Sequence, residues 1–120
     1  MNARTYGRAQ KQIRAICLAL PEATEVEAWG HPTFRAGKKM FAAFGVLEGL
    51  FSLGMKVGFD RQEELLQSDR FFPTPYAARL GWVLLRLDGR TDWDEVRELV
   101  REAYRQVALK RMLRDLDAGA

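Results

Sequence analysis

Apolar residues recur with helical spacing at both ends of the chain and with strand-like alternation between them, and this change of period most constrains the fold. The first stripe has the i, i+3, i+4, i+7 spacing of an amphipathic helix and consists of Ile13, Ile16, Cys17 and Leu20. The second consists of Trp93, Val96, Val100, Ala103 and Val107. We expect a helix over residues 5–20 that stops at Pro21, a second that Thr91 caps, and a helical tail over 109–116 before a fraying end.

The middle of the chain predicts strands over residues 24–29, 33–35, 39–44, 50–57 and 82–87. Gly37 supplies the positive φ of a tight turn between the second and third of these. Asp60 and Glu63 have the spacing of a capping box and open a short helix through residue 68. Residues 70–81, with two prolines, predict an irregular loop. Strands joined by local turns favour an antiparallel sheet, so we predict an α+β fold with the N- and C-terminal helices packed on one face.

The length of 120 residues suits a single domain over residues 1–120. Cys17 is the only cysteine, which excludes an intrachain disulfide and favours a reducing, cytoplasmic setting. Its place in an apolar helical stripe predicts a buried, unreactive thiol. We find no signal-peptide pattern and no apolar run of about 20 residues that could cross a membrane, so we expect no membrane partner.

The inventory of reactive side chains favours binding over catalysis. His31 is the only histidine, and with one cysteine it cannot complete a zinc site without carboxylates. No nucleotide-binding, hydrolase or metalloprotease motif occurs, and paired acids such as Asp92 and Asp94 suit a helix start. Next to Pro32, His31 is expected in a loop, bonding local backbone. We therefore predict no enzyme, no metal, no cofactor and no evident small-molecule substrate.

The net charge of +3 comes from the first third of the chain, since residues 1–40 hold seven lysines and arginines against three acids. Basic residues gather around the predicted hairpin and the strands next to it, and an aromatic side chain lies among them. The candidate phosphate-binding residues are Arg35, Lys38, Lys39, Lys56, Arg79 and Trp82. Trp82 or Tyr76 offers a plane on which a base can stack. A solvated face whose lysines discourage edge pairing explains the same pattern.

A protein-interaction module is the rival interpretation. Helices on one side of a small sheet leave its other face free for a partner or a second copy of the chain. Aromatic residues of the types enriched in interface hot spots would lie at its edge: Phe71, Phe72, Tyr76 and Trp82.

Ordered short motifs resemble the MmcQ/YjbR family of small bacterial proteins. They are Leu20-Pro21 with Glu25, Gly30-His31-Pro32-Thr33-Phe34-Arg35, Gly37-Lys38-Lys39-Met40-Phe41-Ala42, Met55-Lys56, Phe72-Pro73-Thr74-Pro75-Tyr76, Gly81-Trp82-Val83, Leu87-Asp88-Gly89 and Tyr104. The chain departs from the family pattern at three positions. Glu22 stands where the family often has glycine, so we expect a different turn there. Met55 replaces the usual leucine, and Ala103 replaces the usual serine. The resemblance implies an α+β fold related to secretion chaperones and DNA binding through paired hairpin wings, with no established catalytic activity.

Overall fold

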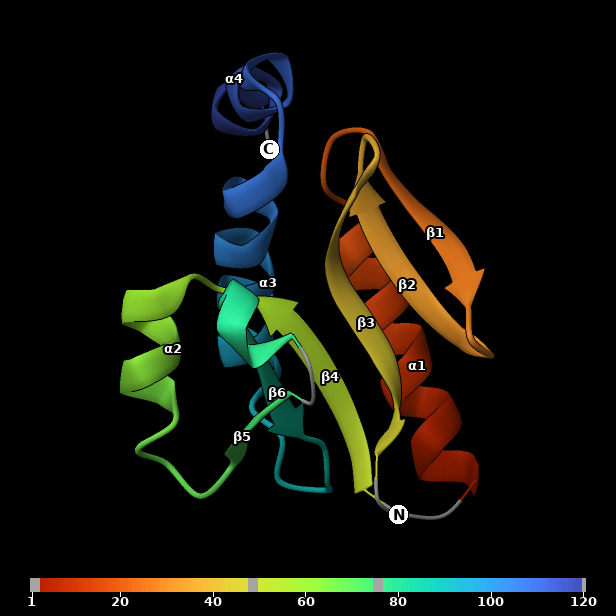
Figure 1. Ribbon diagram of the computed structural model, residues 1–120. Helices are drawn as coiled ribbons and strands as arrows, with labels where there is room; N and C mark the ends of the chain where they lie inside the picture. The colour runs from red at the N-terminus through yellow and green to blue at the C-terminus, as the bar shows by residue number, and fades with distance from the viewer. Residues whose placement is uncertain (1–2, 48–49, 75–76, 120) are drawn as a thin grey trace.

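The computed structural model describes residues 3–47, 50–74 and 77–119 and has four α-helices, six strands and one short 3₁₀ helix in these ranges (Figure 1). In chain order the elements are α1 (Ala3–Leu18), β1 (Ala23–Ala28), β2 (His31–Ala36), β3 (Lys39–Leu47), β4 (Leu50–Lys56), α2 (Phe59–Leu65), β5 (Phe71–Pro73), η1 (Ala78–Leu80), β6 (Trp82–Arg86), α3 (Trp93–Val107) and α4 (Lys110–Gly119).

The six strands form one sheet in the order β1-β2-β3-β4-β6-β5, and every neighbouring pair is antiparallel. The predicted α+β class and antiparallel sheet are therefore confirmed. Trp82–Arg86 lies between β4 and β5, as the apolar residues on both of its faces predict. The register shifts between Phe34 and Arg35, so β2 and β3 pair irregularly near the turn that joins them.

Helices α1 and α3 lie on the same side of the sheet (Figure 1). Both predicted stripes face this interface, where Ile13, Cys17 and Val100 have no exposed surface. Phe41 meets Tyr104 edge to face, with ring centroids 5.5 Å apart, at the centre of the core. Burial raises the pKa of the Cys17 thiol, in line with the predicted inert side chain. None of the helices in the described ranges is long and apolar enough to cross a membrane.

Two tight turns shape the β1-β2-β3 part of the sheet. Trp29 and Gly30 form the two-residue link between β1 and β2, and both have positive φ, at 53° and 79°. Such a turn matches the twist of the strands but is costly for a bulky residue. Gly37 has φ of 64° in the β2–β3 turn, as predicted, and a side chain at this position would reach Met112 of α4.

The segment that follows α1 is held by α3 and α4. The Tyr104 hydroxyl donates a hydrogen bond of 2.7 Å to the Pro21 carbonyl, and Arg111 of α4 pairs with Glu22 at 2.8 Å. Glu22 has φ of 57°, in the left-handed region that favours glycine. At this position, where the family often has glycine, a non-glycine residue therefore adopts a backbone conformation typical of glycine.

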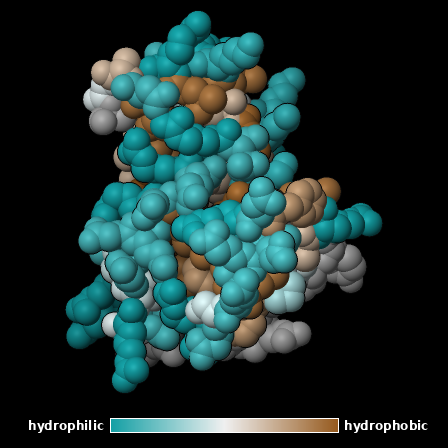
Figure 2. Space-filling view, turned by 90° about the vertical axis from the view of Figure 1, so that its left-hand side faces the viewer, coloured by the Kyte–Doolittle hydropathy of each residue, from teal (hydrophilic) through white to brown (hydrophobic). Residues whose placement is uncertain are grey.

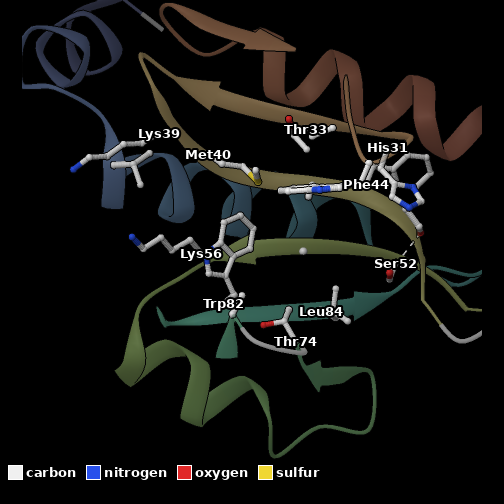
Figure 3. Close-up of a pocket in the computed structure, with 17 residues that line it drawn as sticks. His31, Thr33, Lys39, Met40, Phe44, Ser52, Lys56, Thr74, Trp82 and Leu84 are labelled. Carbon is white, nitrogen blue, oxygen red and sulfur yellow. Dashed lines mark hydrogen bonds between the residues drawn. The ribbon is translucent and has the colours of Figure 1, made fainter. Parts of the chain in front are cut away.

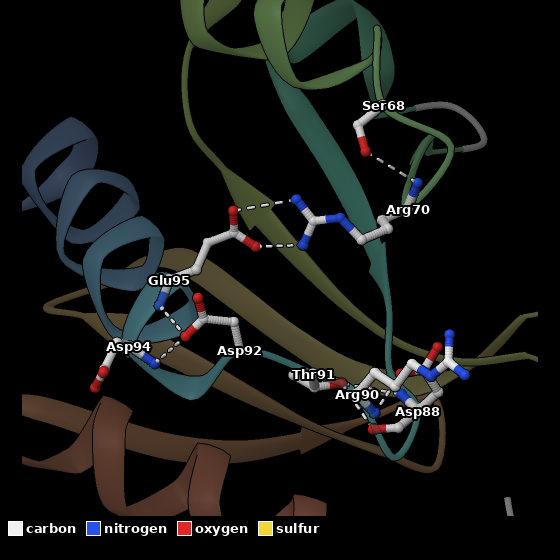
Figure 4. Close-up of polar contacts among 8 residues, drawn as sticks. All are labelled: Ser68, Arg70, Asp88, Arg90, Thr91, Asp92, Asp94 and Glu95. Carbon is white, nitrogen blue, oxygen red and sulfur yellow. Dashed lines mark hydrogen bonds and ion pairs between the residues drawn. The ribbon is translucent and has the colours of Figure 1, made fainter.

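Both predicted helix caps are wrong. Helix α2 begins at Phe59 after Gly58, so Asp60 already lies within the first turn and its carboxylate caps nothing. At α3 the cap is Asp92, whose carboxylate accepts hydrogen bonds from the backbone of Asp94 and Glu95. The Thr91 hydroxyl instead exchanges hydrogen bonds with the Asp88 backbone (Figure 4).

The predicted loop over residues 70–81 is also incorrect. It contains β5, which pairs with β6, and the 3₁₀ helix η1. Proline is tolerated in β5 because this strand lies at the sheet edge, where one side needs no partner. Arg70, just before β5, forms a two-pronged ion pair with Glu95 of α3, at 2.6 and 3.2 Å (Figure 4).

Helix α4 runs to Gly119, so residues 118 and 119 do not fray as expected.

Candidate functional site

The sheet face opposite α1 and α3, called the free face below, carries a groove floored by small residues. Strand register places Ala43, Gly45, Ser52 and Gly54 on this face in the two central strands. A Cβ on Gly54 would stand 3.4 Å from Leu84 and 3.6 Å from Trp82, both of which lie beside it on β6. The absence of side-chain bulk at these floor positions hollows the face.

The groove has a volume of about 830 Å³, within the range of small-molecule sites. Met40, Trp82 and Leu84 line its middle, where Thr74 and Ala77 also contribute. Lys39 and Lys56 lie at one end and His31 at the other (Figure 3). The Thr74 hydroxyl is buried and has no hydrogen-bond partner among the described residues.

The lysine end opens where two central strands separate. The described pairs between β3 and β4 run from Leu47–Leu50 to Ala42–Met55. Beyond that point, Met40 pairs only with β2, and Lys56 pairs only with β6. Val107, near the end of α3, lines the groove in this opening. The groove therefore reaches from the sheet surface towards the helical layer.

All six predicted nucleic-acid-binding residues belong to one end of the sheet, where β2 ends, β3 begins, β4 ends and β6 begins. We call this the cationic end. Lys39, Lys56 and Trp82 line the groove. Lys38 is exposed in the β2–β3 turn, and Arg79 is exposed on η1, just before β6; neither lines the groove.

Arg35 is on the free face by register and half-buried, and its Nε has no hydrogen-bond partner among the described residues.

The cations of the cationic end differ from most other arginines of the chain in their surroundings. None of Arg35, Lys38, Lys39, Lys56 and Arg79 pairs with a carboxylate in the part of the chain that the structure describes. By contrast, six arginines of the helical side and its flanks are held in ion pairs: Arg14, Arg61, Arg70, Arg97, Arg105 and Arg111. Other cations of that side, such as Arg8 and Arg101, form no ion pair among the described residues. Figure 2 shows the flank that carries α2 and α4, covered mainly by hydrophilic residues.

The carboxylates of the described strands lie on the other side of the sheet. In β1, Glu25 and Glu27 alternate with Thr24, Val26 and Ala28, and Glu25 points to the helical side, where it meets Arg14 at 2.6 Å. No aspartate or glutamate occupies a free-face position in the described strands. The free face is therefore cationic at the end that carries Lys39 and Lys56 and uncharged over its floor. At the other end it carries Arg86, which lies opposite Ser52 and 3.9 Å from the Asp88 carboxylate.

Trp82 is held in place by the segment around it. The Gln62 side-chain amide donates hydrogen bonds of 2.7 Å to the carbonyls of Ala78 and Trp82, so α2, η1 and β6 are tied together. Gly81 has φ of 86°, and a Cβ there would stand 3.1 Å from Gly58. This close contact between two glycines fixes where β6 begins.

The prediction that His31 lies in a loop and bonds local backbone is wrong. The sequence analysis also did not predict the groove. His31 is the first residue of β2, and no described group forms a hydrogen bond with its ring. Three ring atoms lie 2.8 to 3.2 Å from where a Gly45 Cβ would stand, so the ring lies flat over this glycine. Small residues at alternate positions, Ala43 and Gly45 in one segment and Ser52 and Gly54 in the next, were the signal that could have indicated a hollow face.

Three of the four aromatic residues proposed for the interface are described, and they divide between the two faces of the sheet. Phe71 is 4% exposed and belongs to the core, where its ring lies 5.3 Å from the Arg70 guanidinium, so its predicted exposure is wrong. Phe72 pairs with Leu84 and is half-buried at the free-face edge. Tyr76 lies outside the described residues.

No group of three or more histidine, cysteine, aspartate or glutamate side chains that could hold a metal ion occurs within residues 3–47, 50–74 and 77–119. The groove residues include no nucleophile paired with a base in the described ranges. The side chains of the groove are suited to binding. Cations lie at one end, aromatic and aliphatic side chains form the walls, and residues with small side chains form the floor.

Two solved structures share the fold. A protein of Deinococcus radiodurans, DR2400, with a DUF419 domain, matches with a TM-score of 0.72 and 25% identity, over 90% of this chain and 87% of that one. A Pseudomonas syringae protein solved by the Northeast Structural Genomics Consortium matches with a TM-score of 0.64 and 16% identity, over 89% and 99% of the chains. No curated protein matches by sequence. The YjbR family model matches residues 18–106, from the end of α1 through nearly all of α3, and the chain therefore belongs to the YjbR family.

Proposed function

We propose that this protein binds nucleic acid through the cationic end of the free face and does so without catalysis. The observation that carries the proposal is the gathering of Arg35, Lys38, Lys39, Lys56 and Arg79 at one end of the sheet, without carboxylate partners among the described residues. Cations that are not already neutralised by protein acids release the counterions of a phosphate backbone when they bind it.

Aromatic side chains near both ends of the groove support the same proposal. Trp82 lies next to Lys56 in the sheet, and Trp29 is 86% exposed at the tip of the β1–β2 hairpin. Indole rings next to phosphate-binding cations are suited to stacking on unpaired bases. About four phosphate contacts on duplex DNA would give a slope near −4 for the logarithm of the binding constant against that of the salt concentration.

The test is fluorescence anisotropy of labelled DNA titrated with the protein at several salt concentrations. The double variant Lys39→Gln/Lys56→Gln is expected to reduce the magnitude of the salt slope by about 2. The matched control is Arg8→Gln/Lys11→Gln, which removes two exposed cations from α1, on the opposite side of the sheet. No anisotropy change at about 50 mM salt, a permissive condition for phosphate contacts, or an equal loss of slope in the control would refute the proposal.

A second candidate is a protein interface, and the edge strand β1 favours it. Its residues from Thr24 to Glu27 are exposed, with Val26 on the free face at 41%, and its outer backbone edge has no neighbouring strand in the described sheet. An open edge is a template for pairing with another chain. Light scattering at micromolar concentration tests for a homodimer. A dimer that covers Trp82 excludes stacking of a base on the same ring.

A further inference from the structure

We propose that the groove of the free face binds a medium-chain alkyl carboxylate, with the carboxylate between Lys39 and Lys56 and the hydrocarbon chain along the floor towards His31. This inference goes beyond nucleic-acid binding and does not rest on it. Phosphate contacts use the exposed cations, including Lys38 and Arg79, which do not line the groove, whereas a hydrocarbon chain needs the groove interior.

The interior offers an apolar path. Gly54 and Ala43 form the floor by strand register. Met40, Trp82 and Leu84 form the walls (Figure 3). At the far end the His31 ring lies flat over Gly45, and the Ser52 hydroxyl is directed to the Gly45 carbonyl at 3.5 Å. Arg86, opposite Ser52 on β6, does not line the groove and lies 3.9 Å from the Asp88 carboxylate. A hydrocarbon chain at this end therefore meets the face of the imidazole and a hydroxyl that is already hydrogen-bonded, and deprives few polar groups of a partner.

The lysine end offers the charge for the head group. Lys39 and Lys56 come from strands that have separated, and the aliphatic Val107, the last residue of α3, also lines the groove. Neither ammonium pairs with a carboxylate in the described residues. Two cations at one end of an apolar groove complement one anionic group on an apolar molecule.

The length of the groove favours an extended chain. Ser52 at the histidine end and Lys56 at the lysine end are four residues apart on β4, which corresponds to about 13 Å along a strand. The volume of about 830 Å³ accommodates an alkyl chain with room for water around the head group.

Isothermal titration calorimetry with decanoate tests the proposal on the full chain. We expect decanoate to bind more tightly than octanoate by roughly 15-fold, because each buried methylene contributes about a fourfold change in the dissociation constant. Decanol, which has the chain without the charge, is expected to bind at least about tenfold more weakly than decanoate. Decanol binding as tightly as decanoate, or no dependence on chain length, would overturn the proposal.

Two sets of variants locate the ligand. Lys39→Gln/Lys56→Gln should remove the preference for decanoate over decanol, whereas the matched pair Arg8→Gln/Lys11→Gln should keep it. Gly54→Val should abolish decanoate binding, because the new side chain fills the floor next to Leu84 and Trp82. The same variant should keep the salt-dependent DNA affinity, so a failure of one proposal is separable from a failure of the other.

If Gly54→Val does not fold, as judged by circular dichroism, Ala43→Leu fills the same floor from β3 and serves as the second variant. Unchanged decanoate affinity in a folded floor variant would place the ligand elsewhere and refute the proposal. A dimer in sedimentation that also fails to bind decanoate in calorimetry would refute the proposal as well. A second copy of the chain would then occupy the groove.

Discussion

The imidazole ring of His31 occupies the space that a side chain on Gly45 would need: a Cβ on this glycine would stand 2.8 Å from Nδ1 of the ring. The two residues lie on neighbouring strands of the free face. Gly45 thus determines where the only histidine of the chain lies at the far end of the groove.

Gly45→Ala is expected to displace the His31 ring and to lower the free energy of unfolding by about 1 kcal/mol. Because His31 is the only histidine, its ring signals in an NMR spectrum are unambiguous, and we expect them to shift. The matched control is Gly54→Ala, whose Cβ would make ordinary contacts of 3.4 Å and longer. A larger shift of the His31 signals in the control than in Gly45→Ala would contradict the interpretation.

Tyr104→Phe removes the hydroxyl that donates to the Pro21 carbonyl and leaves the ring against Phe41. Tyr104 has no exposed surface, so the carbonyl loses a partner that water does not readily replace. We expect a loss of about 1 kcal/mol in the free energy of unfolding, measured by urea denaturation. Tyr6→Phe is the control, because the Tyr6 ring packs on Phe44 and Phe51. Equal losses in the two variants would show that the hydrogen bond to Pro21 contributes nothing.

The Arg14–Glu25 ion pair predicts a defined pH dependence. Hydrogen bonds from the Arg14 guanidinium lower the pKa of Glu25 below its ordinary value of 4.5. A carboxylate with a lowered pKa in the folded state contributes stability that is complete above the unfolded pKa and is lost as the pH falls through the folded one.

Arg14→Gln should therefore be less stable than the unmodified protein by up to about 1 kcal/mol above pH 5, since the pair is partly exposed. The difference in stability between the two proteins should shrink towards zero as the pH falls below 5. Thermal unfolding of both proteins between neutral pH and pH 3 checks this expectation. A stability difference that grows on acidification would have the wrong sign.

Trp29→Asn is expected to stabilise the β1–β2 hairpin by roughly 1 kcal/mol, because asparagine adopts positive φ at lower cost than tryptophan. The indole is 86% exposed, so little packing is lost. Trp29→Ala is the matched control, since it removes the same ring and keeps the unfavourable backbone. If Trp29→Asn is no more stable than Trp29→Ala in chemical denaturation, the backbone of Trp29 is not strained.

The elements that the sequence predicted well are those whose residues repeat with one period. The stripe through Ile13 and Cys17 and the alternation of Leu53 and Met55 both lead to fully buried positions. The predicted cap at Asp60 lies two residues after the observed cap, Gly58, and the predicted cap at Thr91 lies one residue before Asp92. Both were misplaced because a helix start depends on shifts of one or two residues. Strand β5 was missed because Pro73 breaks the local pattern, while pairing with β6 supplies the order.

The candidate site was predictable in its residue types and not in its shape. Lys38 and Lys39 were recognisable as a basic turn, and strand order then brings Lys56 and Arg79 to the same end. The groove depends on long-range relationships: the neighbouring positions of β3 and β4, their separation before Ala42 and after Met55, and the His31 ring over Gly45. None of these is encoded in a local window of sequence.

The thiol of Cys17 can report how often helix α1 detaches from the sheet. Its side chain has no exposed surface, and burial raises the pKa of the thiol, so the reactive thiolate is scarce while α1 stays in place. A thiol reagent can modify it only during fluctuations that detach the first helix from the sheet. The rate of labelling under native conditions therefore measures how often this helix lifts away.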